Sequence, residues 1–144
     1  MDYRTVFEIS GAGMSLEKRR VEVAAMNLAN MYSSVPAGQV GYQPQRVVAQ
    51  PLTMSFGQAY EQFGASTVVP HSVSLETINA APRLVRDPGH PHANAQGFVS
   101  YPAIDQASEM VSVTMALRAY EADVAVATSA RQMASKALEI GGQG

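Results

Sequence analysis

The chain has 144 residues, a formal net charge of −2 and only 15% charged residues, against about 25% in an average soluble domain. This slightly acidic balance gives no support for nucleic acid or an anionic membrane as a partner. The absence of cysteine excludes disulfides, thiolate zinc sites and cysteine nucleophiles. A chain with so few charges would be a poor monomer on its own, so we expect it to assemble into something larger.

The first expected element is a helix from about Tyr3 to Met31. Glycine within a helix costs about 1 kcal/mol relative to alanine, and this segment contains Gly11 and Gly13. Either the helix breaks there, or the small residues let another helix approach closely. The helix itself is predicted from apolar or small residues at steps of three and four, in one series of Val6, Ile9, Gly13, Leu16 and Val23 and a neighbouring one of Phe7, Met14, Val21, Ala24 and Leu28.

A loop and a small β-rich body are expected to follow. Asn27-Leu28-Ala29-Asn30 should close the helix, because Asn is a weak helix former that bonds locally and tolerates a left-handed backbone. Asp87-Pro88-Gly89 suits a type II turn with its glycine in the left-handed region. Residues 55–64 form either a loop or a short helical turn. The β-prone runs are 47–49, 67–69, 72–75, 83–85 and 97–101.

The last third of the chain predicts a second, longer helix. Asp105 is the expected N-cap and Gly141-Gly142 the expected end. About 36 helical residues would span about 54 Å. Charged residues, Asp123 among them, occupy much of the helix outside two apolar stripes, which need partners on more than one side. One stripe contains Met110, Val113, Leu117, Tyr120, Val124, Ala127, Ala134 and Leu138, and the other Val111, Met115, Ala119, Ala122, Val126, Ala130, Met133, Ala137 and Ile140.

Nothing in the sequence supports an enzyme. His90-Pro91-His92 is the one candidate metal cluster, but a catalytic zinc site needs a third rigidly held ligand. A polar surface loop is therefore the preferred interpretation of these histidines. No nucleophile-elbow, phosphate-loop or zinc-protease motif occurs. We expect no cofactor, no membrane span and no signal peptide, since the N-terminus lacks an apolar core.

Three stretches of the chain resemble the axial proteins of the bacterial flagellum, the rod and hook family. The first is Ala25–Asn30, with Gly41-Tyr42 following it. The second, 81–91 continued by 96–102, is similar to a segment typical of the short proximal-rod members of the C type. The third, 109–138, is similar to the shared C-terminal helix. Residues 31–37 depart from the family pattern, which has a short turn there.

This resemblance implies an α+β fold in which residues 1–31 and 105–144 form a coaxial helical rod core and 32–104 form the body. It implies a structural subunit of the proximal rod, which transmits torque and surrounds the export channel in the periplasmic space. The implied partners are copies of this chain, other rod proteins and the flagellar type III export apparatus. The expected subunit-interface residues are Val6, Ile9, Leu16, Val23, Leu28, Met110, Val113, Leu117, Tyr120, Val124, Ala127 and Leu138.

Three alternatives stay open at this point. A stand-alone helical adaptor would explain the helices but not the double apolar stripe. A metal-dependent enzyme would have to rely on His90 and His92 alone. A different rod or hook–basal-body subunit would share both helices.

Overall fold

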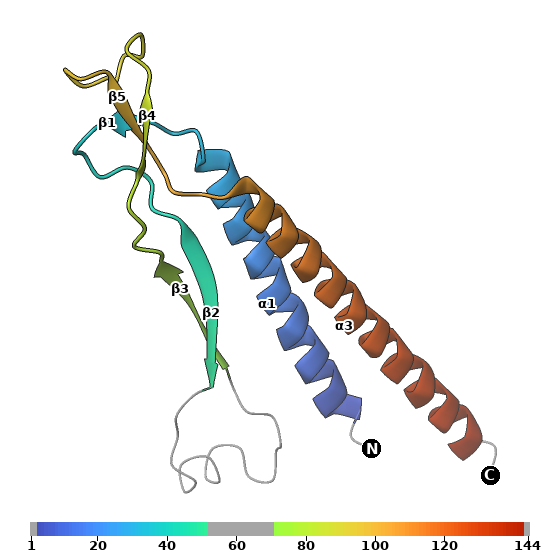
Figure 1. The fold of residues 1–144 in the computed structure, drawn as a ribbon. Coiled ribbons are helices and arrows are strands. Elements are labelled where there is room, and N and C mark those ends of the chain that lie inside the picture. Colours follow the sequence, from blue (N-terminus) through green and yellow to red (C-terminus); the bar gives the residue numbers. More distant parts are fainter. Residues whose placement is uncertain (1–2, 52–70, 143–144) are drawn as a thin grey trace, which may run out of the picture. The chain divides into compact units, whose positions relative to one another are not determined.

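The computed structural model describes residues 3–51 and 71–142. A long helix stands at each end of the chain, with a set of short strands between them in the sequence, which confirms the predicted α+β class (Figure 1). The predicted runs at 55–64 and 67–69 lie outside the described residues. The elements in chain order are α1 (Tyr3–Asn30), β1 (Val35–Pro36), β2 (Gln45–Pro51), β3 (His71–Thr77), β4 (Arg83–Arg86), β5 (Phe98–Tyr101) and α3 (Gln106–Gly141).

The chain divides into two compact units, and each long helix contributes to both. One unit comprises Met1–Lys18, Val48–Ser74 and Leu117–Gly144. The other comprises Arg19–Val47 and Leu75–Ala116, and it contains the three-stranded sheet. These units cut across the division into a helical core and a middle body, which stays a prediction.

Helix α1 runs without a break through both of its glycines and ends at Asn30. The last carbonyls of a helix lack intrahelical partners, and local bonds supply them here. The Asn30 side chain donates to the Met26 carbonyl (2.8 Å), and the Ser33 amide and hydroxyl both donate to the Asn30 carbonyl (3.0 and 2.7 Å). The expected local bonding at Asn30 is therefore confirmed. The left-handed backbone is not used, since no non-glycine residue described here has a positive φ.

At Gly13 a side chain of α3 lies close against α1. A methyl group at Gly13 would overlap the Asp123 carboxylate, whereas one at Gly11 would meet nothing within 4 Å. Close approach is thus the reason for only one of the two glycines. It also corrects the placement of Asp123, which faces α1 instead of lying between two outward stripes.

We expect Gly13→Ala to destabilise the chain by about 1–2 kcal/mol, because the overlap outweighs the gain in helix propensity. Gly11→Ala should instead stabilise it by about 0.5–1 kcal/mol. Urea unfolding of both variants checks this, and Asp123→Ser added to Gly13→Ala should recover most of the loss. Equal effects of the two alanines would contradict the close approach.

Helix α3 begins and ends where the sequence predicts. The Ser108 amide donates to the Asp105 carboxylate at 3.1 Å, so Asp105 is the N-cap. Glu109 lies in the first turn, where a negative charge favours the helix dipole. The helix ends at Gly141, and the Gly142 amide donates to the Leu138 carbonyl at 2.9 Å.

The strands form a three-stranded sheet of order β1-β5-β4 and a two-stranded sheet of β2 and β3. Strand β5 is central and antiparallel to both neighbours, with Val35 opposite Ser100 and Val85 opposite Val99. Val99 is fully buried and anchors this sheet. Four of the predicted β-prone runs fall in β2, β3, β4 and β5, whereas β1 lies in a stretch predicted to be loop.

The turn after β4 differs from the predicted type. The His90 amide donates to the Asp87 carbonyl at 3.2 Å, so a turn forms at the expected place. Gly89 does not have a positive φ, which a type II turn requires at that position, so the predicted type is wrong. The left-handed glycine of this loop is Gly97 (φ 77°), at the end of a second turn closed by a bond from its amide to the Asn94 carbonyl.

Candidate functional sites on the two long helices

The least exposed face of each long helix carries mostly small or polar side chains. In one unit Gly13 lies against Asp123, and in the other the Asn27 amide bonds Glu109. These contacts identify the faces on which α1 and α3 meet, and we call them the seam. The seam positions recur at steps of three, four or seven: Val6, Ser10, Gly13, Glu17, Ala24 and Asn27 on α1, and Glu109, Val113, Ala116, Asp123, Ala127, Ala130 and Ala134 on α3.

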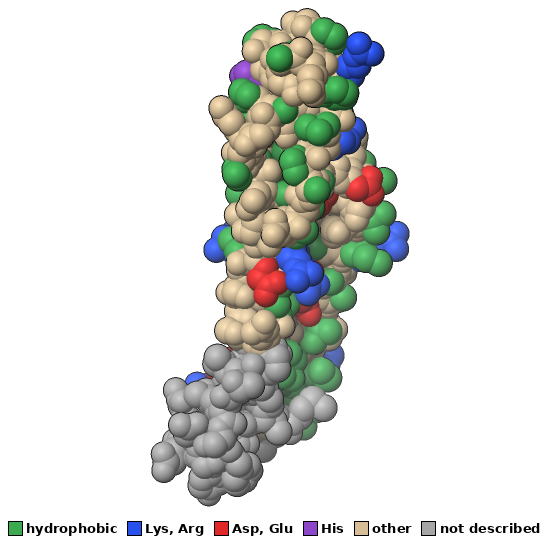
Figure 2. Space-filling view, turned by 60° about the vertical axis from the view of Figure 1, so that its left-hand side comes forward, with side chains coloured by type: hydrophobic (Ala, Val, Ile, Leu, Met, Phe, Trp, Pro, Cys, Tyr) green, Lys and Arg blue, Asp and Glu red, His purple; other side chains and the backbone are tan. Residues whose placement is uncertain are grey.

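Large apolar side chains of α3 lie on both sides of this seam. Successive helical residues are about 100° apart. Leu117 follows the seam residue Ala116 by one position and Met115 precedes it by one, so the two project to opposite sides. Figure 2 shows hydrophobic side chains lying between charged ones on one face of the molecule. We define the first flank as Met110, Leu117 and Val124, and the second flank as Met115, Val126, Met133 and Ile140, all between 40% and 79% exposed.

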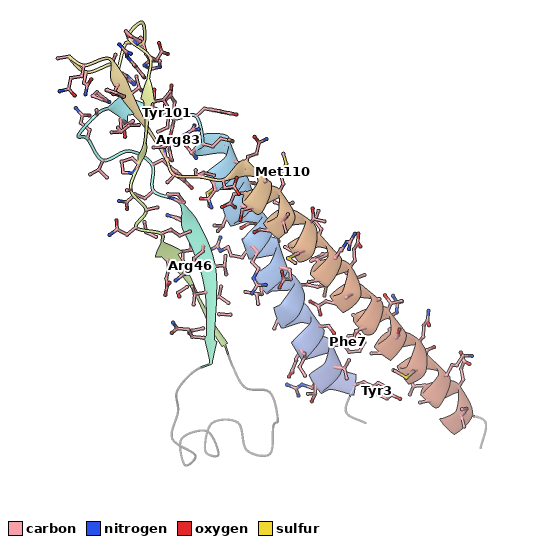
Figure 3. The ribbon with its side chains drawn as sticks, viewed as in Figure 1. Tyr3, Phe7, Arg46, Arg83, Tyr101 and Met110 are labelled. Atoms are coloured by element: carbon pink, nitrogen blue, oxygen red, sulfur yellow. The ribbon has the colours of Figure 1, made fainter. Side chains whose placement is uncertain are left out.

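The predicted interface residues fall into three groups. Val23 is only 2% exposed, so it belongs to the core of the single chain. Val6, Leu16, Leu28, Val113 and Ala127 are partly exposed. Six are available to a partner, at 39% to 77% exposed: Ile9, Met110 (labelled near the start of α3 in Figure 3), Leu117, Tyr120, Val124 and Leu138.

Asn27 forms a buried hydrogen-bond hub with Tyr42, Gln45 and Glu109. It is 1% exposed, although it lies in an α-helix. Its Nδ2 donates to the Gln45 carbonyl (2.8 Å) and to Glu109 Oε1 (3.1 Å). Its Oδ1 accepts from the Gln45 amide (3.0 Å) and the Tyr42 hydroxyl (2.8 Å). Two donors and two acceptors are the full capacity of an amide, so this one side chain ties α1 to α3 and to the start of β2.

The hub corrects the sequence interpretation of Asn27, which was expected to end the helix by local bonding. Asn30 does so, whereas all four bonds of Asn27 reach distant residues. Gly41 allows the loop to pass close to Val35, which places Tyr42 next to Asn27. A Cβ at Gly41 would lie 3.0 Å from a Val35 methyl group, so a side chain there would push the loop outward. Asn27 and Gly41-Tyr42, which belong to the first of the three stretches that resemble the axial proteins, thus meet in one site.

The environment of the hub changes the pKa of Tyr42. Burial raises the pKa of the Tyr42 phenol above its usual value, and the negative charge of Glu109 adds to the shift. The folded chain therefore keeps this proton at pH values where the unfolded chain has lost it. The stability that this pKa shift contributes is therefore fully present below about pH 10 and is lost as pH rises through the folded pKa of Tyr42.

We expect the free energy of unfolding to decline above about pH 10 in the wild type. Tyr42→Phe should lose about 1 kcal/mol at neutral pH, the net value of one hydrogen bond, but should show a shallower alkaline decline. Urea unfolding between pH 8 and pH 11 measures both effects. Parallel alkaline slopes in the two chains would count against a raised pKa of Tyr42 in the folded chain.

Outside the hub, the described polar clusters are modest. Arg46 Nη2 lies 2.9 Å from Glu76 Oε2 in a largely exposed pair, which contributes little. His90 and His92 both approach Ser34. Over residues 3–51 and 71–142, no three histidine or carboxylate side chains gather closely enough to hold a metal ion. Neither of the two described helices is both long and apolar enough to cross a membrane.

Comparison with known proteins finds relatives along nearly the whole chain. Residues 95–140 match the family described as "Flagellar basal body rod FlgEFG protein C-terminal". The flagellar basal-body rod protein FlgC of Salmonella typhimurium is 34% identical over 137 residues, covering 94% of this chain and 96% of the relative. FlgC of Bacillus subtilis is 33% identical, with 92% and 94% covered. FlgC of Borreliella burgdorferi is 28% identical, with 92% and 93% covered.

Proposed function

This chain belongs to the FlgC family of flagellar basal-body rod proteins and is a structural subunit of that rod, and from this premise we propose that it polymerises through the two apolar flanks of α3. The observation that carries the proposal is the distribution of side chains on the helices, whose large apolar residues lie mainly on outward faces and not where the two helices meet. Their mutual seam is mostly small or polar, whereas large apolar residues such as Leu117 and Met115 face outward.

Burying these side chains supplies the driving force for assembly. Each large apolar side chain contributes about 1.5–3 kcal/mol when it is fully removed from water. Contiguous exposed apolar surface marks interaction sites in soluble proteins. Because the flanks lie on opposite sides of one helix, they favour two different neighbours for each subunit. Such head-to-tail contacts generate rings or helical tubes.

The further parts of the proposal rest on family membership together with this geometry. Residues 1–31 and 105–144 form the rod core, which transmits torque and surrounds the export channel, and 32–104 form the outer body. The partners are copies of this chain and other rod proteins, and the flagellar type III apparatus exports the subunit to the periplasmic space without cleaving a leader. The role is mechanical, without catalysis or a cofactor.

The absence of native cysteine permits a direct test. We would introduce single cysteines as Leu117→Cys on the first flank, Met115→Cys on the second and Gln132→Cys on the polar face. A maleimide should label all three in the dilute subunit, where these positions are exposed. In purified basal bodies, labelling at 117 and 115 should fall at least tenfold while 132 stays reactive. Unchanged labelling at both flank positions would refute assembly through them.

A further inference from the structure

A second polar cluster joins the loop between β4 and β5 to the linker between α1 and β1. Ser34 Oγ lies 3.0 Å from His92 Nδ1 and 3.5 Å from His90 Nε2. The backbone N–H of His92 donates to His90 Nδ1 at 3.1 Å. The two imidazole rings are 5.3 Å apart at their centroids, in an edge-on arrangement. We call this cluster of Ser34, His90 and His92 the histidine clasp.

The bond from the His92 amide fixes the protonation state of His90. A nitrogen that accepts an N–H cannot itself carry a proton, so His90 is neutral with its hydrogen on Nε2. Its Nε2 lies 3.5 Å from Ser34 Oγ, which can accept this N–H and also bonds His92 Nδ1. The closed clasp therefore holds a neutral His90.

The charged neighbours come from the strands beside the loop. The Arg83 guanidinium on β4 lies over the Tyr101 ring of β5, 5.9 Å from its centroid. The same ring meets His90 edge-on at 6.4 Å, and Figure 3 shows Arg83 and Tyr101 side by side. A proton on His90 would place a second positive charge beside the Tyr101 ring, in addition to that of Arg83. Arg86 also carries positive charge on β4, and the loop's only carboxylate, Asp87, is exposed to screening solvent.

We propose that the histidine clasp is a pH-sensitive latch, closed when His90 is neutral and opened when Nδ1 takes up a proton. The open form binds a proton that the closed form excludes, so acidification favours opening. Histidine is the side chain that changes charge between about pH 5 and pH 8. Opening releases the loop 87–96 from Ser34, the residue immediately before β1, while the pairing of β1 with β5 stays in place.

The test follows the exchange of the His92 amide with water by NMR in the full-length chain, corrected for the intrinsic pH dependence. Between pH 7.5 and pH 5.5, its protection should fall about fivefold, the value of one net hydrogen bond. The Asp87 amide, which bonds the Gly97 carbonyl in the same loop, should keep its protection. His90→Asn offers an acceptor that does not titrate and should hold the His92 amide protected at both pH values.

Two results would overturn the latch. One is a His92 protection factor that falls equally in wild type and His90→Asn, or that stays constant in the wild type. The other needs no variant: nitrogen chemical shifts of the His90 ring at pH 7.5 that show the proton on Nδ1. Constant protection of the Asp87 amide, combined with the predicted fall in protection of the His92 amide, would establish that the clasp opens locally.

Discussion

Replacing Asn27 with aspartate is expected to lower the free energy of unfolding by about 3–5 kcal/mol. The substitution keeps the shape but exchanges the two donors of Nδ2 for a carboxylate oxygen. That oxygen would face the Gln45 carbonyl and Glu109 Oε1 at the 2.8 and 3.1 Å now spanned by hydrogen bonds. Because a domain has only about 5–15 kcal/mol of stability in total, the variant should be partly unfolded at 37 °C, which urea unfolding measures.

Asn30→Asp is the matched control, because the Asn30 side chain bonds the Met26 carbonyl within its own helix end and is partly exposed. It should cost less than about 1 kcal/mol. Glu109→Gln provides a rescue, since its amide can donate to the introduced carboxylate in the double variant. A coupling energy of about 1–2 kcal/mol in that double-mutant cycle would locate the damage at the Asn27–Glu109 contact. If Asn27→Asp and Asn30→Asp prove equally mild, the hub is not a structural anchor.

The helices were predictable because their cause is local. Steps of three and four, the cap at Asp105 and the glycines at 141 and 142 are all visible in the sequence, and α3 has the expected bounds. Strand β1 was not predictable, since it is two residues long, includes Pro36, and exists only through pairing with β5. The same holds for the Asn27 hub, whose four bonds are brought together only by the fold.

The faces of α3 were harder to assign for a different reason. Apolar periodicity ordinarily marks the side of a helix that packs inside its own chain. Here Ala116 and Asp123 lie on the seam although neither belongs to a predicted stripe, while Leu117 and Val124 are exposed. The sequence of a subunit that assembles contains apolar residues that pack within the chain and others that contact neighbouring subunits. Periodicity alone does not separate these two sets.

Val124→Asp is expected to abolish rod assembly while leaving the single chain folded. Val124 lies on the first flank and is 40% exposed, so a carboxylate there is hydrated in the free subunit and should cost it less than about 1 kcal/mol. Burial of the same carboxylate, unpaired, between two subunits costs several kcal/mol, and the cost recurs at every copy. The variant should therefore be produced and exported but leave cells without a complete rod, hook or filament. Counts of basal bodies and of released subunit measure this.

The control must place the same charge on the polar face of α3. Ala125→Asp does so one residue further along, at an exposed position between Glu121 and Thr128. Asp123→Ala is unsuitable as a neutral control, because Asp123 lies against Gly13 within the chain. Ala125→Asp should give rods in near-normal number and restore motility in a deletion strain. Normal rods from Val124→Asp, with circular dichroism showing both variants folded, would mean that the first flank faces water in the rod and that another surface holds the subunits together.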